Sequence, residues 1–291
     1  LALTLVLFAG TLAPPGALAG TGTGPGTGPD AGPRLALVVG NAAYQGVAGL
    51  DNPGRDAALI ARTLEARGFA VTLVLDAGQA GMNRAIAGFG AALRAAGPEA
   101  TGLFYYAGHG VQSFGTNYLV PIDAQLTDAA DLGLVAVPAE AVLRQMASAR
   151  NRTNIVILDA CRDNPFVTVP DMNDRGLAEM NAPTGTFLAY ATAPGAVALD
   201  GQDGNSPFTR ALVTEMAVVG LPLEQLFRQV RVRVLAETRG RQTPWDASSL
   251  TAPFHFLPPE TLSAEELAAR QLWQSVKDTR DPVQIMLFLR A

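Results

Sequence analysis

Runs of consecutive apolar residues alternate along this chain with segments in which apolar side chains recur every three to four positions. Residues 34–41 form the first apolar run, and residues 51–69 carry apolar side chains at the helical period before Gly68. An uninterrupted apolar run indicates a strand buried on both faces, and the 3.6-residue period indicates an amphipathic helix. Glycine at the end of such a period is typical of a helix C-terminus. This stretch therefore predicts a buried strand followed by a helix.

The same alternation continues to residue 160. It predicts strands at 70–76, 101–110 and 153–160, helices at 82–97 and 138–150, and a short hairpin at 111–123. Strands that alternate with helices form a mostly parallel sheet, with helices on both faces and right-handed connections. The fold class is therefore α/β.

The pattern changes after residue 163. Residues 164–184 carry Pro, Asp, Asn and Gly without a period, which predicts a long loop, and loops of this length in compact domains are usually functional or disordered. A strand at 185–193, helices at 205–220 and 222–240 and a last strand at 252–257 follow. Ser206 is the expected N-cap of the first of these helices, with Pro207 at its first position.

Both ends of the chain differ from this core. Residues 1–9 are a short apolar run, and Ala17 and Ala19 form the small-x-small pattern of a signal-peptidase site. We therefore expect a signal peptide, truncated at its start, over 1–19, a Gly/Pro-rich linker over 20–33 and a folded domain over 34–258. A helical segment is expected over 259–291, with two helices of which the first is capped by Ser263, and it could contact a protein partner.

The apolar run at the N-terminus is too short to span a bilayer. The protein is therefore expected to be exported, periplasmic or secreted, with no stable membrane span once the signal is removed. An N-terminal lipid-facing anchor is the alternative interpretation. The chain carries a formal net charge of −5 and no Lys/Arg cluster, so nucleic acid is not expected as a partner.

The supply of metal-ligating and nucleophilic side chains is small. One cysteine and two histidines are too few for a typical zinc site, and no metal or cofactor is expected, although calcium dependence cannot be judged from the sequence. The glycine fingerprint of dinucleotide-binding folds and the nucleophile elbow of serine hydrolases are both absent. In an exported protein a single cysteine cannot form an internal disulfide, which favours a functional role for Cys161 over a buried structural one.

Two residues with catalytic chemistry follow predicted strands. His109 comes just after the apolar residues 103–108, near the end of the strand predicted at 101–110, and Cys161 comes just after the strand at 153–160. If these strands are neighbours, their carboxyl ends lie about 5 Å apart, so the imidazole and the thiol can meet. An imidazole lowers the pKa of a thiol and can protonate a leaving amine. The backbone N–H groups of Gly110 and Cys161 are natural donors to an oxyanion, whereas an ordinary turn is the alternative for Gly-His-Gly.

These residues resemble a known family. "YYAGHG", followed 52 positions later by "DAC", resembles the caspase-like cysteine peptidases, nearest to their bacterial and metacaspase branch. Further likeness lies in "ALVVGNAAYQGVAGLDNPGRDA", "YLVPIDA", "SPFTRAL" and "QTPW". The resemblance implies a three-layer sandwich with an approximately six-stranded, mostly parallel sheet. It also implies an endopeptidase whose His109/Cys161 dyad hydrolyses peptide bonds through a thioester acyl-enzyme.

The chain departs from animal caspases next to the cysteine. Asp159 stands where caspases have a glutamine that contributes to a basic substrate pocket, and a carboxylate there favours a guanidinium or ammonium group. Metacaspases pair this aspartate with another after the first strand, which best matches Asp56. The resemblance therefore implies substrate binding by Asp56 and Asp159 and cleavage after Arg or Lys. A solvated carboxylate at a helix start is the alternative for Asp56, and Asp123 is a weaker third candidate that is better explained as a turn residue.

Other residues leave alternatives open. His255 is expected to pack in a strand, and Trp245 could line a substrate cleft or simply pack. Arg175 in the long loop is a candidate self-processing site. The rival function is a catalytically weak or inactive caspase-like module that binds or scaffolds another protein.

Overall fold

The computed structural model describes residues 32–160, 164–172, 174, 176–201, 204–259 and 264–277, together with 279, 281, 283 and 286. The expected signal peptide and almost all of the expected linker lie outside the described residues, as do Cys161, Arg175 and Ser263. No helix within the described ranges is both long and apolar enough to cross a membrane.

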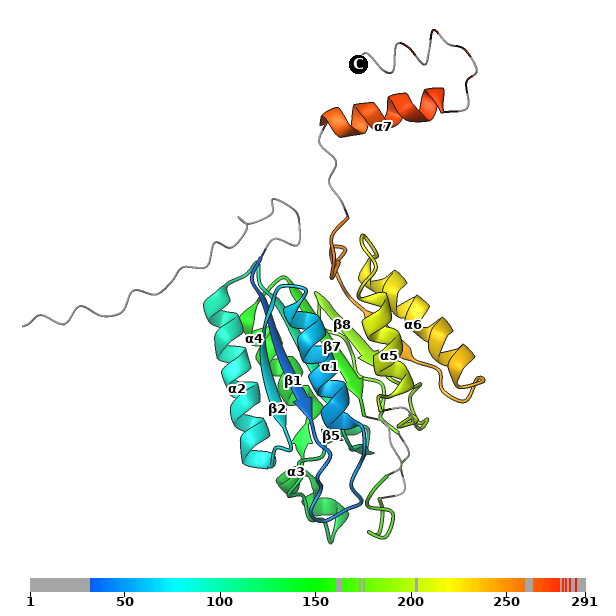
Figure 1. Ribbon diagram of the computed structural model, residues 1–291. Coiled ribbons are helices and arrows are strands. Elements are labelled where there is room, and N and C mark those ends of the chain that lie inside the picture. Colours follow the sequence, from blue (N-terminus) through cyan, green and yellow to red (C-terminus); the bar gives the residue numbers. More distant parts are fainter. Residues whose placement is uncertain are drawn as a thin grey trace, which may run out of the picture.

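A six-stranded sheet forms the centre of the fold (Figure 1). Its strands, in spatial order, are β2 (Phe69–Leu75), β1 (Arg34–Gly40), β3 (Thr101–Ala107), β7 (Thr153–Asp159), β8 (Thr186–Tyr190) and β9 (Trp245–Ser248). The first five are parallel, and β9 is antiparallel to β8. Every residue of β3, β7 and β8 is buried, as expected for inner strands covered on both faces. The predicted α/β fold with a mostly parallel sheet is confirmed.

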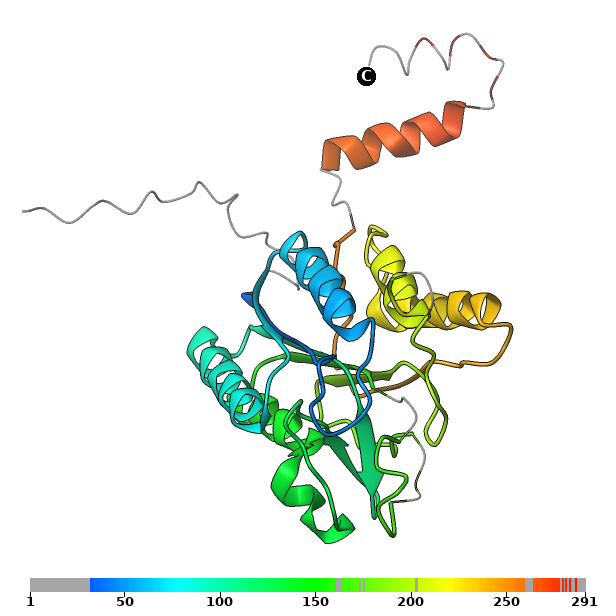
Figure 2. The ribbon, with the colours of Figure 1, turned by 60° about the horizontal axis from the view of Figure 1, so that its bottom comes forward.

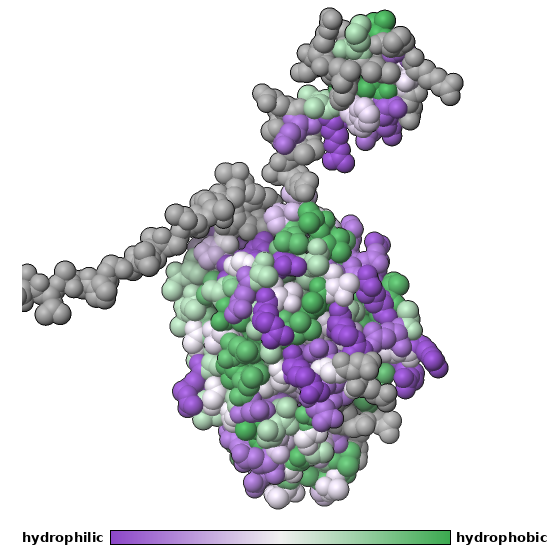
Figure 3. All heavy atoms as spheres, in the orientation of Figure 1, coloured by the Kyte–Doolittle hydropathy of each residue, from purple (hydrophilic) through white to green (hydrophobic). Residues whose placement is uncertain are grey.

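Helices cover both faces of this sheet. They are α1 (Pro53–Glu65), α2 (Gln79–Ala96), α4 (Ala139–Ala149), α5 (Pro207–Glu215) and α6 (Leu223–Glu237). Figure 2 shows α1, α5 and α6 on one face and α2 and α4 on the other. The connections from β1 to β2 and from β2 to β3 run in opposite directions along the sheet, so right-handed crossovers place α1 and α2 on opposite faces. Apolar and polar side chains are interspersed over the face seen in Figure 3.

A second, smaller sheet follows β3 directly. It consists of β4 (Gly110–Ser113), β5 (Thr116–Leu119) and β6 (Val137–Pro138), and the short helices η1 (Ala129–Asp131) and α3 (Leu132–Val135) precede β6. Strands β4 and β5 form the predicted hairpin. Its turn residues Phe114 and Gly115 both have positive φ, as a two-residue hairpin turn of type I′ requires.

Local signals at helix ends are also confirmed. Ser206 is the N-cap of α5, where its Oγ accepts a hydrogen bond from Thr209 N at 2.9 Å, and Pro207 is the first helical residue. Gly68 follows α1 with φ of 79°. Between β7 and β8 the described residues contain no helix or strand, in agreement with the predicted loop.

The predicted strand at 252–257 is wrong. Only an isolated bridge joins His255 to Pro222, and the sixth strand is β9 instead. Phe254 and Phe256 are buried, and the Arg34 guanidinium donates hydrogen bonds to the carbonyl oxygens of His255 and Phe256. The same guanidinium lies 5.2 Å from the centre of the Phe254 ring. The alternation of Phe254, His255 and Phe256 therefore results from packing around the Arg34 side chain and not from membership of the sheet.

The C-terminal segment contains α7 (Ala264–Val276), which agrees with the first predicted helix. Figures 1 and 2 both show α7 apart from the body of the α/β domain. Trp273 of this helix is 52% exposed. The second predicted helix falls mainly outside the described residues.

Candidate active site

The register of the sheet brings the two candidate catalytic segments to the same edge. Strands β3 and β7 are parallel neighbours in which Ala107 pairs with Asp159, and Gly108 N donates to Asp159 O at 3.4 Å. His109 follows Ala107 by two positions, and Cys161 follows Asp159 by two positions. The condition that the third and fourth core strands be neighbours is therefore met. Cys161 itself lies outside the described residues.

The imidazole of His109 is buried and held in place by the segment after β1. Its Nε2 lies 2.9 Å from Ala48 O, and its ring lies 4.7 Å from the Tyr44 ring, centre to centre. Only 4% of His109 is exposed. Because a carbonyl oxygen can only accept, this hydrogen bond requires the proton on Nε2. The neutral ring therefore has Nδ1 as its basic nitrogen, the form that a general base needs.

Two tyrosine hydroxyls hold the backbone of His109. His109 N donates to the Tyr44 hydroxyl at 2.7 Å, and the Tyr106 hydroxyl donates to His109 O at 2.8 Å. Burial raises the pKa of Tyr106 well above its ordinary value, and the neighbouring Tyr44 raises this pKa further. Tyr106 therefore stays neutral and remains a donor. Tyr44 is not among the site residues predicted from the sequence, where the only signal for it is its position shortly after the first strand.

The tyrosine pair also explains the first glycine of Gly-His-Gly. A Cβ added to Gly108 would lie 2.6 Å from the Tyr44 hydroxyl oxygen and 2.7 Å from that of Tyr106. These separations are shorter than any carbon–oxygen contact allows. Gly108 is therefore required because the Tyr44 and Tyr106 hydroxyls, which hold His109, leave no room for a side chain. An ordinary turn would not impose this requirement.

Gly110 is buried, and its backbone lies next to the segment that leads to Cys161. It is the first residue of β4 and pairs with Leu119, while Val120 N donates to His109 O at 3.0 Å. Hydrogen-bonded and non-bonded pairs alternate along an antiparallel ladder, so the Gly110 N–H points away from β5. A Cβ on Gly110 would lie 3.1 Å from the Cβ of Ala160, the residue before Cys161. The chain thus brings the candidate oxyanion donor against the end of the cysteine strand.

His109 forms part of the wall of an open pocket of about 530 Å³. Its other described walls come from Ala48 and Leu50, from Asn164 and Pro165, and from residues 197–200. These three segments follow β1, β7 and β8 at the carboxyl edge of the parallel sheet, where ligands bind in open α/β folds. His109 therefore lies at the edge of the sheet where ligands bind in folds of this class.

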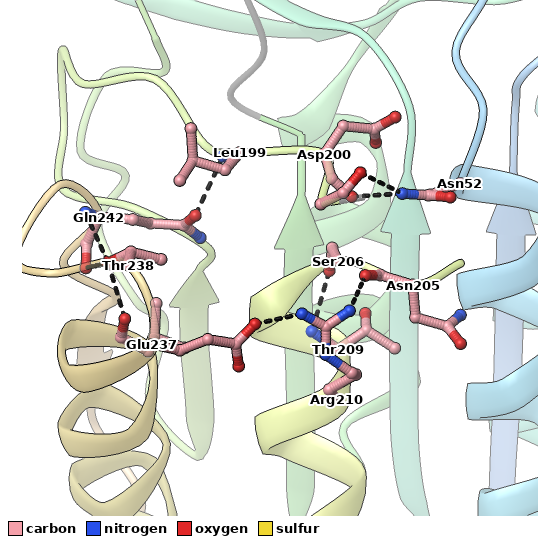
Figure 4. Close-up of polar contacts among 12 residues, drawn as sticks. Asn52, Leu199, Asp200, Asn205, Ser206, Thr209, Arg210, Glu237, Thr238 and Gln242 are labelled. Carbon is pink, nitrogen blue, oxygen red and sulfur yellow. Dashed lines mark hydrogen bonds and ion pairs between the residues drawn. The ribbon is translucent and has the colours of Figure 1, made fainter. Parts of the chain in front are cut away.

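The wall at 197–200 is fixed from two directions (Figure 4). The buried side chain of Gln242 accepts a hydrogen bond from Leu199 N at 3.0 Å and donates one to Ala191 O at 2.8 Å. From the N-cap position of α1, the Asn52 amide donates to the carbonyl oxygens of Asp200 and Gly201. Gln242 and Asn52 were not predicted as site residues. Neither belongs to a residue type or pattern that indicates a role at a functional site.

The two candidate specificity carboxylates are brought together by Ser206. Asp56 Oδ1 accepts hydrogen bonds from Ser206 N at 3.0 Å and from the Asn205 side chain at 2.7 Å. Asp159 Oδ2 accepts from Ser206 Oγ at 2.5 Å and from Thr209 Oγ1 at 3.1 Å. Figure 4 shows Asn205, Ser206 and Thr209 together at the start of α5. Both aspartates are 0% exposed, so Asp56 lies in the first turn of α1 but is not the solvated carboxylate of the alternative interpretation.

The remaining candidates lie elsewhere. Asp123 occupies a turn, and its Oδ1 accepts a hydrogen bond from Gln79 N at the start of α2, at 2.9 Å. His255 lies near Arg34, at the opposite end of β1 from the pocket. Trp245 begins β9 opposite Tyr190 and does not belong to the described wall of the His109 pocket. Asp56 and Asp159 are also absent from that described wall.

The site thus combines a mostly parallel α/β sheet with a buried, hydrogen-bonded histidine beside the segment that leads to the cysteine of the chain. Comparison with protein families identifies it further. The model of the caspase domain, a peptidase family, matches residues 33–255, and the chain belongs to this family.

Two curated mammalian proteins are similar over part of the chain. The human mucosa-associated lymphoid tissue lymphoma translocation protein 1 is 29% identical over 169 residues, which is 57% of this chain and 19% of the human protein. The mouse homologue matches with the same identity and the same coverage. The similarity thus spans about a fifth of these relatives, so it concerns one part of them.

Proposed function

We propose that the protein is a cysteine-type endopeptidase that uses His109 and Cys161 to cleave peptide or protein substrates after Arg or Lys. The hydrogen bond between His109 Nε2 and Ala48 O carries this proposal, because it leaves Nδ1 as the basic nitrogen. Membership of the caspase domain family supports the same reaction class. No cofactor is needed for it.

The reaction follows from the roles of these groups. His109 Nδ1 takes the proton of the Cys161 thiol, and the thiolate attacks the carbonyl carbon of the peptide bond. The Gly110 and Cys161 N–H groups stabilise the resulting oxyanion. The imidazolium then protonates the leaving amine as the C–N bond breaks, and a thioester remains. His109 next takes a proton from water, whose oxygen attacks the thioester, and the departing thiolate is reprotonated as the acid is released.

The buried carboxylates support selectivity for a cationic side chain. Asp56 and Asp159 accept hydrogen bonds from the same residue, Ser206, although Asp56 and Ser206 are 150 positions apart. Two buried carboxylates concentrate negative charge in one place, and negative charge favours a guanidinium or ammonium group. Acidic side chains would be repelled. Selectivity is a separate prediction from catalysis and is tested separately.

Catalysis is tested with fluorogenic peptides that end in Arg, Lys or Asp before the reporter group. We expect turnover by the wild-type chain and none by Cys161→Ala with the same purity and folding. Turnover that persists in Cys161→Ala would exclude the dyad. Absence of turnover with every peptide would instead favour a binding or scaffold module.

Selectivity is tested with Asp159→Asn, which keeps the shape of the side chain and removes its charge. Truncating one partner of a buried charge pair commonly costs 2–5 kcal/mol, so kcat/KM for the Arg peptide is expected to fall about 100-fold. The Asp peptide gains relative to the Arg peptide. A wild-type preference for Asp, or an unchanged Arg preference in the variant, would refute the acidic pocket.

A further inference from the structure

A short segment of the long loop is clamped by a buried asparagine from the hairpin. We name residues Gly176–Met180 the strap. Asn117 in β5 is 0% exposed, and its amide makes both of the hydrogen bonds that a paired strand would make. Its Nδ2 donates to Ala178 O at 2.7 Å, and its Oδ1 accepts from Ala178 N at 2.7 Å. This side chain therefore fixes the strap against the hairpin that begins next to His109.

The strap supports the candidate oxyanion donor. Leu177, immediately before Ala178, is 0% exposed. Its Cδ2 lies 3.2 Å from the position that a Cβ on Gly110 would occupy, so the leucine packs directly against the Gly110 backbone. The Cβ of Ala160 lies 3.1 Å from the same position. Gly110 therefore packs against both the strap and the residue that follows β7.

The strap also supports the pocket wall. Leu177 O accepts a hydrogen bond from Gly195 N at 3.1 Å, two residues before the wall begins at Val197. Gly176 has φ of 63°, and a Cβ there would lie 2.5 Å from Ala196 O, so only glycine fits this approach. At the other end of the strap, Met180 N donates to the Tyr190 hydroxyl at 3.1 Å. The strap therefore joins the hairpin, Gly110 and the pocket wall.

We propose that Asn117 is a positioning residue for the peptidase reaction: by clamping the strap, it sets the Gly110 N–H at the place where the oxyanion develops. This inference rests on the proposed function and deepens it. Asn117 acts through Leu177 and Gly110 and touches no reacting atom. The geometry also separates this role from that of His109, because the described hydrogen bonds from the His109 imidazole to Ala48 O and from the His109 backbone N–H to the Tyr44 hydroxyl do not involve the strap.

If Asn117 positions the Gly110 N–H and not the His109 imidazole, Asn117→Ala should weaken oxyanion binding and leave thiolate formation unchanged. Misplacing an oxyanion donor by about 1 Å costs up to about 100-fold, so kcat is expected to fall about 10- to 100-fold with KM little changed. Affinity for a peptide aldehyde, whose adduct with Cys161 places a tetrahedral oxygen at the same site, is expected to fall by a similar factor. Alkylation of Cys161 by iodoacetamide forms no oxyanion, and its rate is expected to stay at the wild-type value.

A matched control is available in Asn151→Ala. Asn151 is also buried, and its Nδ2 lies within hydrogen-bond distance of Ala100 O, Thr153 O and Asn154 Oδ1, at the opposite end of the sheet. This variant is expected to lower the melting temperature without changing kcat. Leu177→Val is the milder second variant. It shortens the side chain and so weakens its contact with Gly110, while the hydrogen bonds between Asn117 and Ala178 remain. We expect it to lower kcat and aldehyde affinity by a smaller factor.

The outcomes separate the hypotheses. Loss of kcat and aldehyde affinity with normal alkylation in Asn117→Ala or Leu177→Val supports the inference. Folded variants with wild-type kcat would overturn it, and so would a parallel loss of kcat and alkylation, which indicates general disruption. A wild-type chain without Cys161-dependent turnover would refute the proposed function itself, whichever way the Asn117 variants behave.

Discussion

Replacement of Tyr44 by phenylalanine tests how His109 is held. The change removes one hydroxyl, which is the acceptor of the 2.7 Å hydrogen bond from His109 N. It keeps the ring, whose centre lies 4.7 Å from that of the imidazole. The hydrogen bond from His109 Nε2 to Ala48 O also remains. The variant therefore loosens the backbone of His109 without deleting its ring contacts.

The expected magnitude follows from burial. Because His109 is 4% exposed, its N–H would be left without an acceptor inside the protein, at a cost of about 1–3 kcal/mol. For a domain of this size that loss lowers the melting temperature by about 2–10 °C. A displaced imidazole is a poorer base, and we expect kcat/KM to fall about 10-fold, which is about 1.4 kcal/mol of transition-state stabilisation.

The assay combines thermal unfolding, peptide turnover and the rate of Cys161 alkylation by iodoacetamide near pH 6.5. Alkylation reports the thiolate that His109 promotes, so its rate is expected to fall in Tyr44→Phe. Tyr105→Phe is the control, because it also removes a buried hydroxyl, 2.7 Å from Thr209 Oγ1 and away from His109. It is expected to lower stability but not alkylation. Equal alkylation and turnover in wild type and Tyr44→Phe would refute the tethering role.

Two further predictions concern the same tyrosine pair. Gly108→Ala places a Cβ 2.6 Å from the Tyr44 hydroxyl oxygen, so turnover is expected to fall at least about 10-fold even in protein that remains folded by circular dichroism; wild-type turnover would show that the loop adapts. The pKa of Tyr106 is raised by burial above its ordinary value of 10.0, so the fold favours its neutral form. Its contribution to stability is therefore complete below about pH 10 and is lost at higher pH, and Tyr106→Phe is expected to reduce the fall in unfolding free energy between pH 9 and 11 measured in urea.

Local patterns in the sequence predict most of the framework. Buried strands such as β3 and β7 appear as continuous apolar runs because helices cover both of their faces. The adjacency of these two strands was only a condition in the sequence-based prediction, and the sheet meets it, which brings His109 toward the segment that leads to Cys161. Ser206 was predictable as a cap because its hydrogen bond to Thr209 is local.

The remainder depends on contacts between distant segments. Asp56 looks like a solvated helix-start carboxylate until Ser206, 150 positions later, buries it. Residues 254–256 alternate like a strand, yet Arg34, more than 200 positions earlier, donates hydrogen bonds to the carbonyl oxygens of His255 and Phe256. The clamp between Asn117 and Ala178 spans 61 positions and has no pattern in either segment. The period of apolar residues shows which face of a segment is buried. It does not show which distant residue contacts that segment.

The candidate general base, His109, and the candidate oxyanion donor, Gly110, are adjacent in the chain but are contacted by different segments. His109 is held by Tyr44 and Ala48, which follow β1, whereas Gly110 is held by Leu177, which follows β7. Adjacent residues usually move together, so a single deformation would be expected to disturb both proton transfer and oxyanion binding. Here each residue has its own contacts to a different segment, and each segment is itself tied to a strand of the sheet. Independent support of this kind is what allows thiol alkylation and aldehyde affinity to report on the two halves separately.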